Sequence, residues 1–418
     1  MTTTRAMKAV LINTSDSIGG AAVVTYRLMQ ALRREGVDAR MIVFHKTSQD
    51  ENVAQTGHRL SFLRECAYTF CHNGFDRPNL FKISSGYSGL PIWKYHWVKE
   101  ADVIALNWIN QGLLSLDGIE RLASLGKPIV WTMHDMWQLT GVCHHAYECE
   151  RYKERCGRCQ YINNGAKDFD LSRRRWIRKH NLYDDTSIRF VAVSNWLAEK
   201  CRESSLLRNR SIEVIPNAFP IEAFHTSPTR HLPWWDLDRT KNIILMGAAR
   251  IDDPIKGLDY AIDALNIVAE RRKDIAERSQ MVFFGNIRDA SLLDRLKFPY
   301  IHVGPIQDAE VLHQLYASAD VVLSTSLYET LPGTLIEGQA AGCTPVTFGR
   351  GGQSDIVDHG KSGYIAEYRN AESVAEGIIQ ALEKPADREM LHEQVRSRFA
   401  SDVIAKRYIG LFTRMLGS

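Results

Sequence analysis

The sequence predicts an α/β protein built from two doubly wound, Rossmann-like domains. Its 418 residues exceed one typical compact core and suit two domains of about 200 residues each. Short apolar runs alternate with helical stretches in both halves, which is typical of parallel sheets covered by helices on both faces. A loose stretch between residues 217 and 240 separates the two series. In such open sheets, ligands bind beyond the carboxyl ends of the strands.

The first half begins with an apolar strand over Met7 to Asn13, followed at once by the turn Asp16 to Gly20. Residues 21–35 then carry apolar side chains at helical spacing, and Gly36 favours the left-handed backbone that ends a helix. Further buried strands are expected over 37–44, 102–107, 128–134 and 190–194. We therefore assign residues 1–218 to an N-terminal Rossmann-like domain.

The second half repeats this pattern. Its strands are expected over 242–247, 281–284, 300–303, 321–324 and 345–348. We assign residues 219–400 to a C-terminal Rossmann-like domain. Because both domains place their loops at the carboxyl ends of parallel strands, we expect the two domains to face each other across a cleft.

Composition excludes several classes of protein. Hydrophobic residues make up 44% of the chain and charged residues 24%, as in ordinary globular proteins. A net charge of +3 lacks the basic excess of a nucleic-acid binder, so no nucleic-acid partner is expected. No apolar run reaches the roughly 18 residues that span a membrane. The first residues lack a signal-peptide pattern, and we expect a cytoplasmic protein with reduced cysteines.

Two features of the first half fall at carboxyl ends of predicted strands. Gly19-Gly20 would let the backbone approach a ligand closely, and the next helix would offer free N–H groups to an anion. His134, beside Asp135, suits hydrogen bonding to a sugar hydroxyl or acid–base chemistry near neutral pH. A structural glycine turn and a structural histidine are the alternatives.

The segment GAARIDDPIKG places Arg250 and Lys256 after the first strand of the second half. Two cations at this edge would suit a diphosphate, whose charge must be held and then stabilised as it leaves. The alternative is a surface charge pair beside the helix that begins near Gly257.

The segment SLYETLPGTLIEGQAAGCTPV, residues 326–346, is the most specific motif. A helix is expected from near Gly333, so Glu337 lies in its first turns and Glu329 in the preceding loop. A carboxylate there can accept hydrogen bonds from sugar hydroxyls, while free N–H groups bind oxygen atoms. For one glutamate alone, an ordinary acidic helix start would be the better interpretation.

With these motifs in this order, the chain resembles the retaining GT-B glycosyltransferases of family 4. The specific residues are GAARIDDPIKG, Glu329-x7-Glu337 and Gly342-Cys343-Thr344-Pro345-Val346; looser agreement comes from Gly19-Gly20, His134-Asp135, Val193-Ser194-Asn195, Ile215-Pro216-Asn217, Gly351-Gly352 and Gly363. The resemblance covers nearly the entire chain. Many members carry Gly-Phe-Gly-Leu-like residues where this chain has Thr330-Leu331-Pro332-Gly333, a departure closer to the bacterial surface-polysaccharide branch.

The resemblance also implies the site residues. The catalytic set would be Arg250, Lys256, Glu329 and His134. The donor-binding set would be Gly19, Gly20, Gly304, Ile306, Thr330, Leu331 and Glu337. Arg250 and Lys256 would grip the diphosphate, Glu337 the ribose, and Glu329 the transferred sugar, while His134 would reach that sugar from the N-terminal, acceptor-side domain. A final helix within 401–418 would return to that domain.

The implied activity is transfer of a hexose, with retention, from a nucleotide-diphosphate sugar to a glycan or lipid-linked acceptor in bacterial polysaccharide biosynthesis. No DxD-like pair stands where a catalytic metal would be needed, so we expect metal-independent catalysis without a cofactor. A nucleotide-sugar epimerase and a non-catalytic nucleotide-sugar binder are the alternatives. A dinucleotide oxidoreductase is disfavoured, because neither half carries its fingerprint.

Two further features are left open by the sequence. Cys143, Cys149, Cys156 and Cys159 could form a structural zinc site, with His144 or His145 replacing one thiol; the alternatives are reduced cysteines, or disulfides in an oxidising compartment. The basic run 173–180 could lie on an anionic membrane surface, which would make the protein peripheral to the inner membrane, could bind an acceptor diphosphate, or could be a solvated helix face. The aromatic residues of 60–98 are expected in the core.

Overall fold

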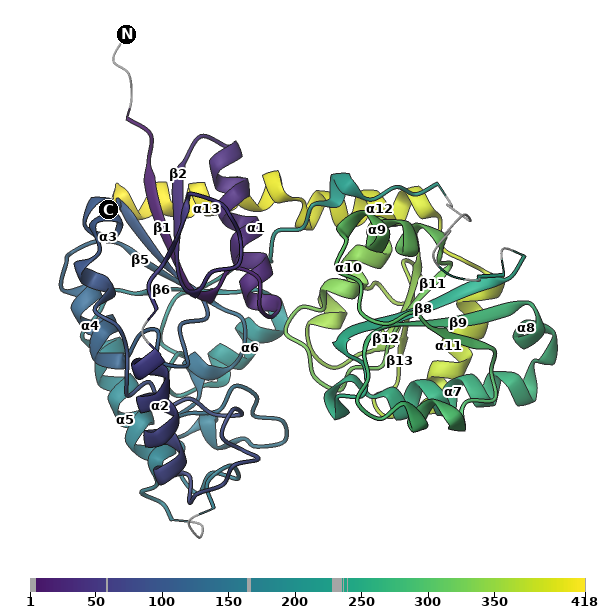
Figure 1. The fold of residues 1–418 in the computed structure, drawn as a ribbon, viewed down its shortest axis with the longest axis horizontal. Coiled ribbons are helices and arrows are strands. Elements are labelled where there is room, and N and C mark those ends of the chain that lie inside the picture. The colour runs from purple at the N-terminus through teal and green to yellow at the C-terminus, as the bar shows by residue number, and fades with distance from the viewer. Residues whose placement is uncertain are drawn as a thin grey trace. The chain divides into compact units, whose positions relative to one another are not determined.

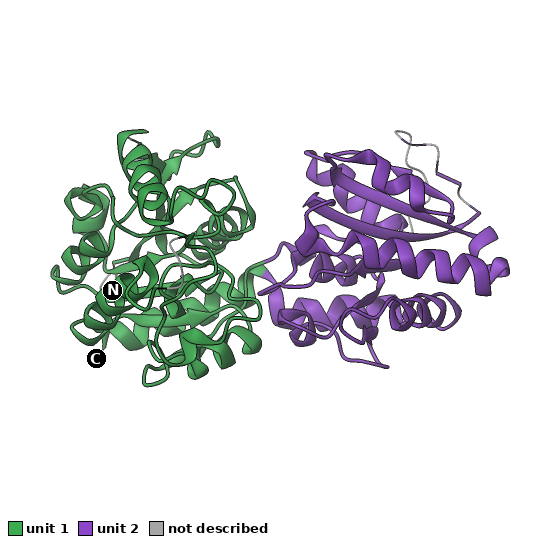
Figure 2. Ribbon diagram, turned by 90° about the horizontal axis from the view of Figure 1, so that it is seen from below, with its two compact units in different colours: residues 1–218, 401–418 green, residues 219–400 purple. Residues whose placement is uncertain are grey.

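The computed structural model describes residues 5–57, 59–163, 167–227, 235, 237–238 and 240–417. The chain divides into two compact units (Figures 1 and 2). Unit 1 contains Met1–Ala218 and Ser401–Ser418, and unit 2 contains Phe219–Ala400. Each unit is a parallel sheet with helices on its faces, which confirms the predicted fold class. Much of the segment expected as a linker, including residues 228–234, lies outside the described residues.

The sheet of unit 1 has seven strands in the order β3-β2-β1-β4-β5-β6-β7, all parallel. These strands are β1 (Lys8–Ser15), β2 (Asp38–His45), β3 (Val53–Gln55), β4 (Val103–Leu106), β5 (Ile129–Met133), β6 (Arg189–Ala192) and β7 (Ile212–Val214). The central β4 and β5 are buried throughout, as expected for strands covered on both faces. The sequence missed β3 and β7, which are short edge strands with little apolar pattern.

The helices of unit 1 are α1 (Gly20–Arg34), α2 (Arg59–His72), α3 (His96–Glu100), α4 (Leu116–Ala123), α5 (Leu171–Asp184), α6 (Asn195–Glu203) and α13 (Ser401–Leu416). Gly36 follows α1 with a φ of 88°, the left-handed conformation expected of it. Helix α13 brings the end of the chain back against α1 and the sheet (Figure 1). There the hydroxyls of Tyr408 and Thr132 of β5 are hydrogen-bonded at 2.8 Å.

Helix α2 is unusual because its buried side chains are polar, namely Ser61, Glu65 and Thr69. The Glu65 carboxylate is 3% exposed and accepts the backbone N–H groups of residues 85–88 and the hydroxyl of Ser85, at 2.7–3.0 Å. By contrast, Phe75, Phe81 and Tyr87 are 67%, 60% and 53% exposed. For these three residues the expected place in the core was therefore wrong, and the Glu65 carboxylate supplies polar contacts that help to hold the segment.

The sheet of unit 2 has six parallel strands in the order β10-β9-β8-β11-β12-β13. Its strands are β8 (Asn242–Arg250), β9 (Ser279–Asn286), β10 (Tyr300–His302), β11 (Val321–Ser324), β12 (Thr344–Phe348) and β13 (Tyr364–Ala366). Its helices are α7 (Leu258–Arg271), α8 (Lys273–Glu277), α9 (Ala309–Ser318), α10 (Gly333–Ala340), α11 (Ala371–Glu383) and α12 (Arg388–Phe399). Among the described helices, none has the length and apolar character needed to cross a membrane.

The hydrogen bonds of Glu65 predict that a conservative substitution at this position lowers the stability of unit 1. In Glu65→Gln, one carboxylate oxygen becomes an NH₂ group that faces N–H donors and leaves them unpaired in the interior. We expect unit 1 to lose about 1–3 kcal/mol of unfolding free energy. Urea unfolding followed by tryptophan fluorescence measures this loss. The exposed Glu51→Gln serves as the control. Equal unfolding free energies for the two variants would contradict a stabilising role of the Glu65 hydrogen bonds.

Candidate functional site

The centre of the candidate site is an ion pair in unit 2. The Lys256 ammonium lies 2.6 Å from a carboxylate oxygen of Glu329, and both side chains are partly buried. Lys256 closes a 3-10 turn after β8, and Glu329 lies in the loop between β11 and α10. The charge of Glu329 raises the pKa of Lys256 against the opposing effect of burial. Because β8 and β11 are neighbours, the two predicted residues meet at one sheet edge.

Backbone contacts fix the loops that carry this pair. The Thr325 hydroxyl donates to the carbonyl oxygens of Lys256 and Gly257, at 3.2 and 2.9 Å. Gly257 has a φ of 65°, and a Cβ atom there would lie 2.1 Å from the Thr325 carbonyl oxygen. Only glycine therefore allows the loops to approach this closely.

Arg250 lies at the end of β8 and is held by acidic neighbours. Its guanidinium donates to Asp253 at 2.7 Å and lies 3.5 Å from Asp252. Asp253 also accepts the N–H of Ile255 and so caps the turn that ends at Lys256. Sequence reasoning did not single out Asp253, although an Asp-Pro step is a common turn start. An anionic ligand at Arg250 would have to compete with this carboxylate.

The second acid, Glu337, lies on α10 and is half-buried, with the Tyr316 hydroxyl donating to it at 3.3 Å. Thr330 and Leu331 precede this helix. Their backbone is packed against Gly352, whose N–H donates to the Glu329 carbonyl at 2.9 Å. A Cβ atom on Gly352 would lie 1.9 Å from the Thr330 carbonyl oxygen, so glycine is required here as well.

Gly304 and Ile306 follow β10, which is the edge strand of the sheet and is separated from β8 by β9. Gly304 has a φ of 78°, and its carbonyl accepts the N–H of Gly285 at 2.8 Å. Ile306 is half-buried. These two residues therefore share the carboxyl edge with Lys256 but lie toward its outer end.

In unit 1, the predicted turn at Gly19-Gly20 is exposed and leads directly into α1. Gly19 has a φ of 89°, and open space surrounds the position where its Cβ would be. The first N–H groups of α1 are thus accessible at the carboxyl edge of β1, as an anion site requires.

His134 follows β5, and its Nε2 lies 3.1 Å from the side-chain oxygen of Asn107. Burial lowers the pKa of His134 to about 4, against the opposing charge of Asp135. The imidazole is therefore neutral at neutral pH. Such a ring can exchange hydrogen bonds with a sugar hydroxyl, but it is not a ready source of protons for a leaving group.

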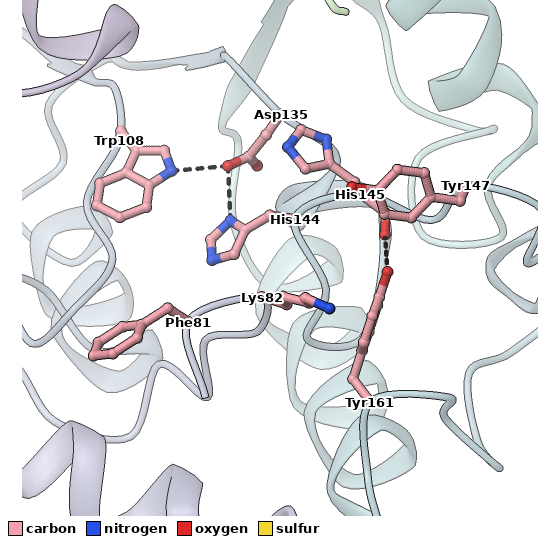
Figure 3. A pocket seen from close by; sticks show the side chains of 8 residues that line it. All are labelled: Phe81, Lys82, Trp108, Asp135, His144, His145, Tyr147 and Tyr161. Carbon is pink, nitrogen blue, oxygen red and sulfur yellow. Dashed lines mark hydrogen bonds and ion pairs between the residues drawn. The ribbon is translucent and has the colours of Figure 1, made fainter. Parts of the chain in front are cut away.

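A second cluster in unit 1 was not found from the sequence. One carboxylate oxygen of Asp135 accepts the indole N–H of Trp108 at 2.8 Å and lies 2.7 Å from Nδ1 of His144 (Figure 3). The other ring nitrogen of His144 lies 2.9 Å from the hydroxyl of Ser84. These residues border a cavity of about 280 Å³, which we call the aromatic pocket; it is lined by Phe81, Lys82, Trp108, Asp135, His144, His145, Tyr147 and Tyr161 (Figure 3).

The four cysteines of the predicted zinc cluster lie in the loop beside this pocket. Burial raises the pKa of Cys156 to about 11 and that of Cys159 to about 12, so both thiols are protonated at neutral pH. The two ring nitrogens of His144 face Ser84 and Asp135, at 2.9 and 2.7 Å. Among the described residues, no group of three or more His, Cys, Asp or Glu side chains is placed to hold a metal ion. Structural zinc stays a prediction.

The basic run lies on α5 and is largely engaged within unit 1. Arg175 donates to the Tyr68 hydroxyl at 2.7 Å, and Arg178 pairs with Asp117 at 2.9 Å. Lys179 is fully buried over the Trp137 ring, where it donates to backbone carbonyls, and burial lowers its pKa to about 7. Arg175, Arg178 and Lys179 are therefore engaged within unit 1. Fewer basic side chains of this run are left to contact a membrane surface or another partner.

Two family models together match most of the chain. A family model described as Glycosyltransferase Family 4 matches residues 18–223, and one described as Glycosyl transferases group 1 matches residues 240–384. The chain spans less than half the length of the curated relatives it matches. One relative, an uncharacterized glycosyltransferase of Methanocaldococcus jannaschii, is 26% identical over 185 residues, which are 42% of this chain and 45% of the relative.

Solved structures match over almost the entire chain. HepE of Anabaena, crystallised with UDP and glucose, has a TM-score of 0.64 at 16% identity, covering 98% of this chain and 100% of that one. A lipopolysaccharide outer core galactosyltransferase, in apo form, has a TM-score of 0.58 at 14% identity, again covering 98% and 100%. At this identity the likeness shows the fold alone: the chain has the GT-B fold.

The lowered pKa of His134 predicts a dependence of stability on pH. The folded-state pKa of about 4 lies below the ordinary value of 6.5, so the unfolded chain takes up the proton first as the pH falls. Stability is therefore lost between about pH 6.5 and pH 4, by up to about 1.4 kcal/mol per pH unit. Urea unfolding at pH 7 and pH 5 should show a smaller loss for His134→Asn than for the wild type. Equal losses of unfolding free energy in the two proteins would contradict the lowered pKa of His134.

Proposed function

The chain belongs to glycosyltransferase family 4, and we propose that it is a retaining enzyme that transfers a hexose from a nucleotide-diphosphate sugar to a glycan or lipid-linked acceptor. We place this activity in bacterial polysaccharide biosynthesis, in the cytoplasm at the periphery of the inner membrane. The Thr330-Leu331-Pro332-Gly333 segment supports this branch of the family. The relation to an outer core galactosyltransferase is consistent with it.

The observation that carries the proposal is the ion pair of Lys256 and Glu329 at the carboxyl edge of the unit 2 sheet. Arg250 joins this pair through Asp253, which contacts its guanidinium and caps the turn that ends at Lys256. One edge therefore presents two cations, Arg250 and Lys256, each beside a carboxylate, Asp253 and Glu329 respectively. This combination matches a sugar diphosphate, which offers anionic oxygens at one end and hydroxyl donors at the other.

The remaining donor contacts follow from position. Glu337 on α10 would accept the ribose hydroxyls, and the backbone N–H groups of Thr330 and Leu331 would bind the phosphate or sugar oxygens. Gly304 and Ile306, at the outer end of the same edge, would border the base. In unit 1, Gly19 and Gly20 would contact the diphosphate and His134 a sugar hydroxyl. HepE, with the same fold, binds UDP and glucose, which makes a uridine nucleotide the first donor to test.

The proposed chemistry needs no metal ion and no enzymic nucleophile. The bond between the anomeric carbon and the diphosphate oxygen breaks while the acceptor oxygen bonds to the same face of that carbon. The acceptor proton passes to the departing phosphate oxygen. Arg250 and Lys256 stabilise the negative charge that develops on the diphosphate, and such preorganised charges contribute most where water is excluded.

The two cations give the test of this mechanism. Arg250→Ala and Lys256→Ala should each lower kcat/KM for the donor about 10²–10³-fold, because each removes a fixed positive charge from the developing anion. Lys297→Ala is the matched control, since Lys297 is 66% exposed and pairs with Glu270 on the unit 2 surface. Melting temperatures of all three variants show whether unit 2 remains folded.

The assay follows both transfer of labelled sugar to acceptors and loss of donor, in the presence of a metal chelator. Folded Arg250 and Lys256 variants with unchanged turnover would contradict the diphosphate role. Conversion of the donor into an isomeric nucleotide sugar without transfer would identify an epimerase. Donor binding without transfer or hydrolysis would identify a non-catalytic binder.

A further inference from the structure

The aromatic pocket of unit 1 has no role in the donor contacts proposed above. Its base is rigid. Asp135 and His144 are 6% and 7% exposed, and Asp135 fixes both the Trp108 indole and the His144 imidazole by hydrogen bonds of 2.8 and 2.7 Å. Ser84 holds the far side of His144, and the Glu65 carboxylate holds the backbone that follows Ser84. A site supported by such a second layer of contacts keeps its geometry when it binds a ligand.

The rim of the pocket is aromatic and exposed. Phe81 is 60% exposed and Tyr147 is 42% exposed, although both have large apolar surfaces. Tyr147 also has a φ of 49°, a left-handed conformation that costs energy for a bulky residue and is commonest at functional sites. Tyr147 thus presents an aromatic ring at the mouth of the cavity.

The chemistry of this lining fits one ligand class. Aromatic faces pack against the C–H face of a sugar ring, and the His145 imidazole, the Lys82 ammonium and the Tyr161 hydroxyl supply hydrogen-bonding groups for its edge. The volume of about 280 Å³ lies at the small end of ligand pockets, which suits a single ring. A long hydrocarbon chain would need a larger and less polar space.

The position of the pocket also fits. Trp108 and Asp135 follow the neighbouring strands β4 and β5 at their carboxyl ends. The backbone N–H of Trp108 donates to the side chain of Asn13, and its carbonyl accepts the N–H of Thr14, both on β1. Strand β1 leads into Gly19-Gly20, where the donor diphosphate is proposed to bind. The pocket thus adjoins the strand end that carries a donor contact.

We propose that the aromatic pocket binds the terminal sugar ring of the acceptor, so that the acceptor is a glycan rather than a bare lipid phosphate. The identification of the bound sugar as the acceptor rests on the proposed function. The ring stacks on Tyr147 and Phe81, and the Lys82 ammonium donates to its hydroxyl edge. The hydroxyl that attacks the donor projects from this ring.

The test is saturation-transfer NMR of the full chain with methyl glycosides of glucose, galactose, mannose and N-acetylglucosamine, and separately with geranyl phosphate. At least one glycoside should bind the wild type. Its affinity should fall tenfold or more in Tyr147→Ala and in Phe81→Ala at unchanged melting temperature. Phe169→Ala is the matched control, because Phe169 is an exposed aromatic residue of unit 1 outside the pocket, and this variant should bind as the wild type does.

The outcomes separate the two proposals, because nucleotide binding to the wild type is scored in the same samples. A nucleotide-induced rise in melting temperature without any glycoside binding overturns the acceptor pocket alone. Glycoside binding that survives both pocket substitutions, or binding of geranyl phosphate that only the pocket substitutions abolish, overturns it as well. Pocket-dependent glycoside binding without any nucleotide effect leaves a sugar site but removes the proposed transferase function.

Discussion

The ion pair between Lys256 and Glu329 is the contact on which the donor side of this protein depends. A partly buried ion pair adds little net stability, because desolvation offsets most of the attraction, so its value lies in position. It joins the loops after two neighbouring strands and holds a cation and a carboxylate side by side. Loss of either partner would leave an uncompensated charge, while the backbone contacts of Thr325 and Gly352 still hold the loops.

Close backbone approach makes this arrangement possible. A Cβ atom on Gly257 would collide with the carbonyl oxygen of Thr325, and one on Gly352 would collide with the carbonyl oxygen of Thr330. Unit 1 fixes its polar side chains in a different way. There the buried carboxylates of Glu65 and Asp135 collect N–H donors from separate loops, and burial keeps His134 neutral. One unit thus presents fixed charge, and the other presents mostly neutral hydrogen-bonding groups.

Most of the fold could be predicted from the sequence, because strands buried on both faces read as short apolar runs. The places of Lys256 and Glu329 after strands of the second half could also be predicted, but their ion pair could not, because it depends on the strand order that makes β8 and β11 neighbours. The aromatic pocket could not: Ser84, Trp108 and His144 are distant in sequence, and no periodic pattern links them. Phe81 was expected in the core, and Tyr147 was not singled out. The sequence gives no sign that either aromatic side chain stays exposed.

The central claim is that a nucleotide sugar binds along the carboxyl edge of the unit 2 sheet. Hydrogen–deuterium exchange of the full chain with UDP, GDP or ADP tests it directly, because ligand binding slows local opening. One nucleotide should protect the segments 250–257 and 327–337 together, while α8 exchanges as in the free protein. Protection confined to other segments, or no protection by any nucleotide, would contradict the account.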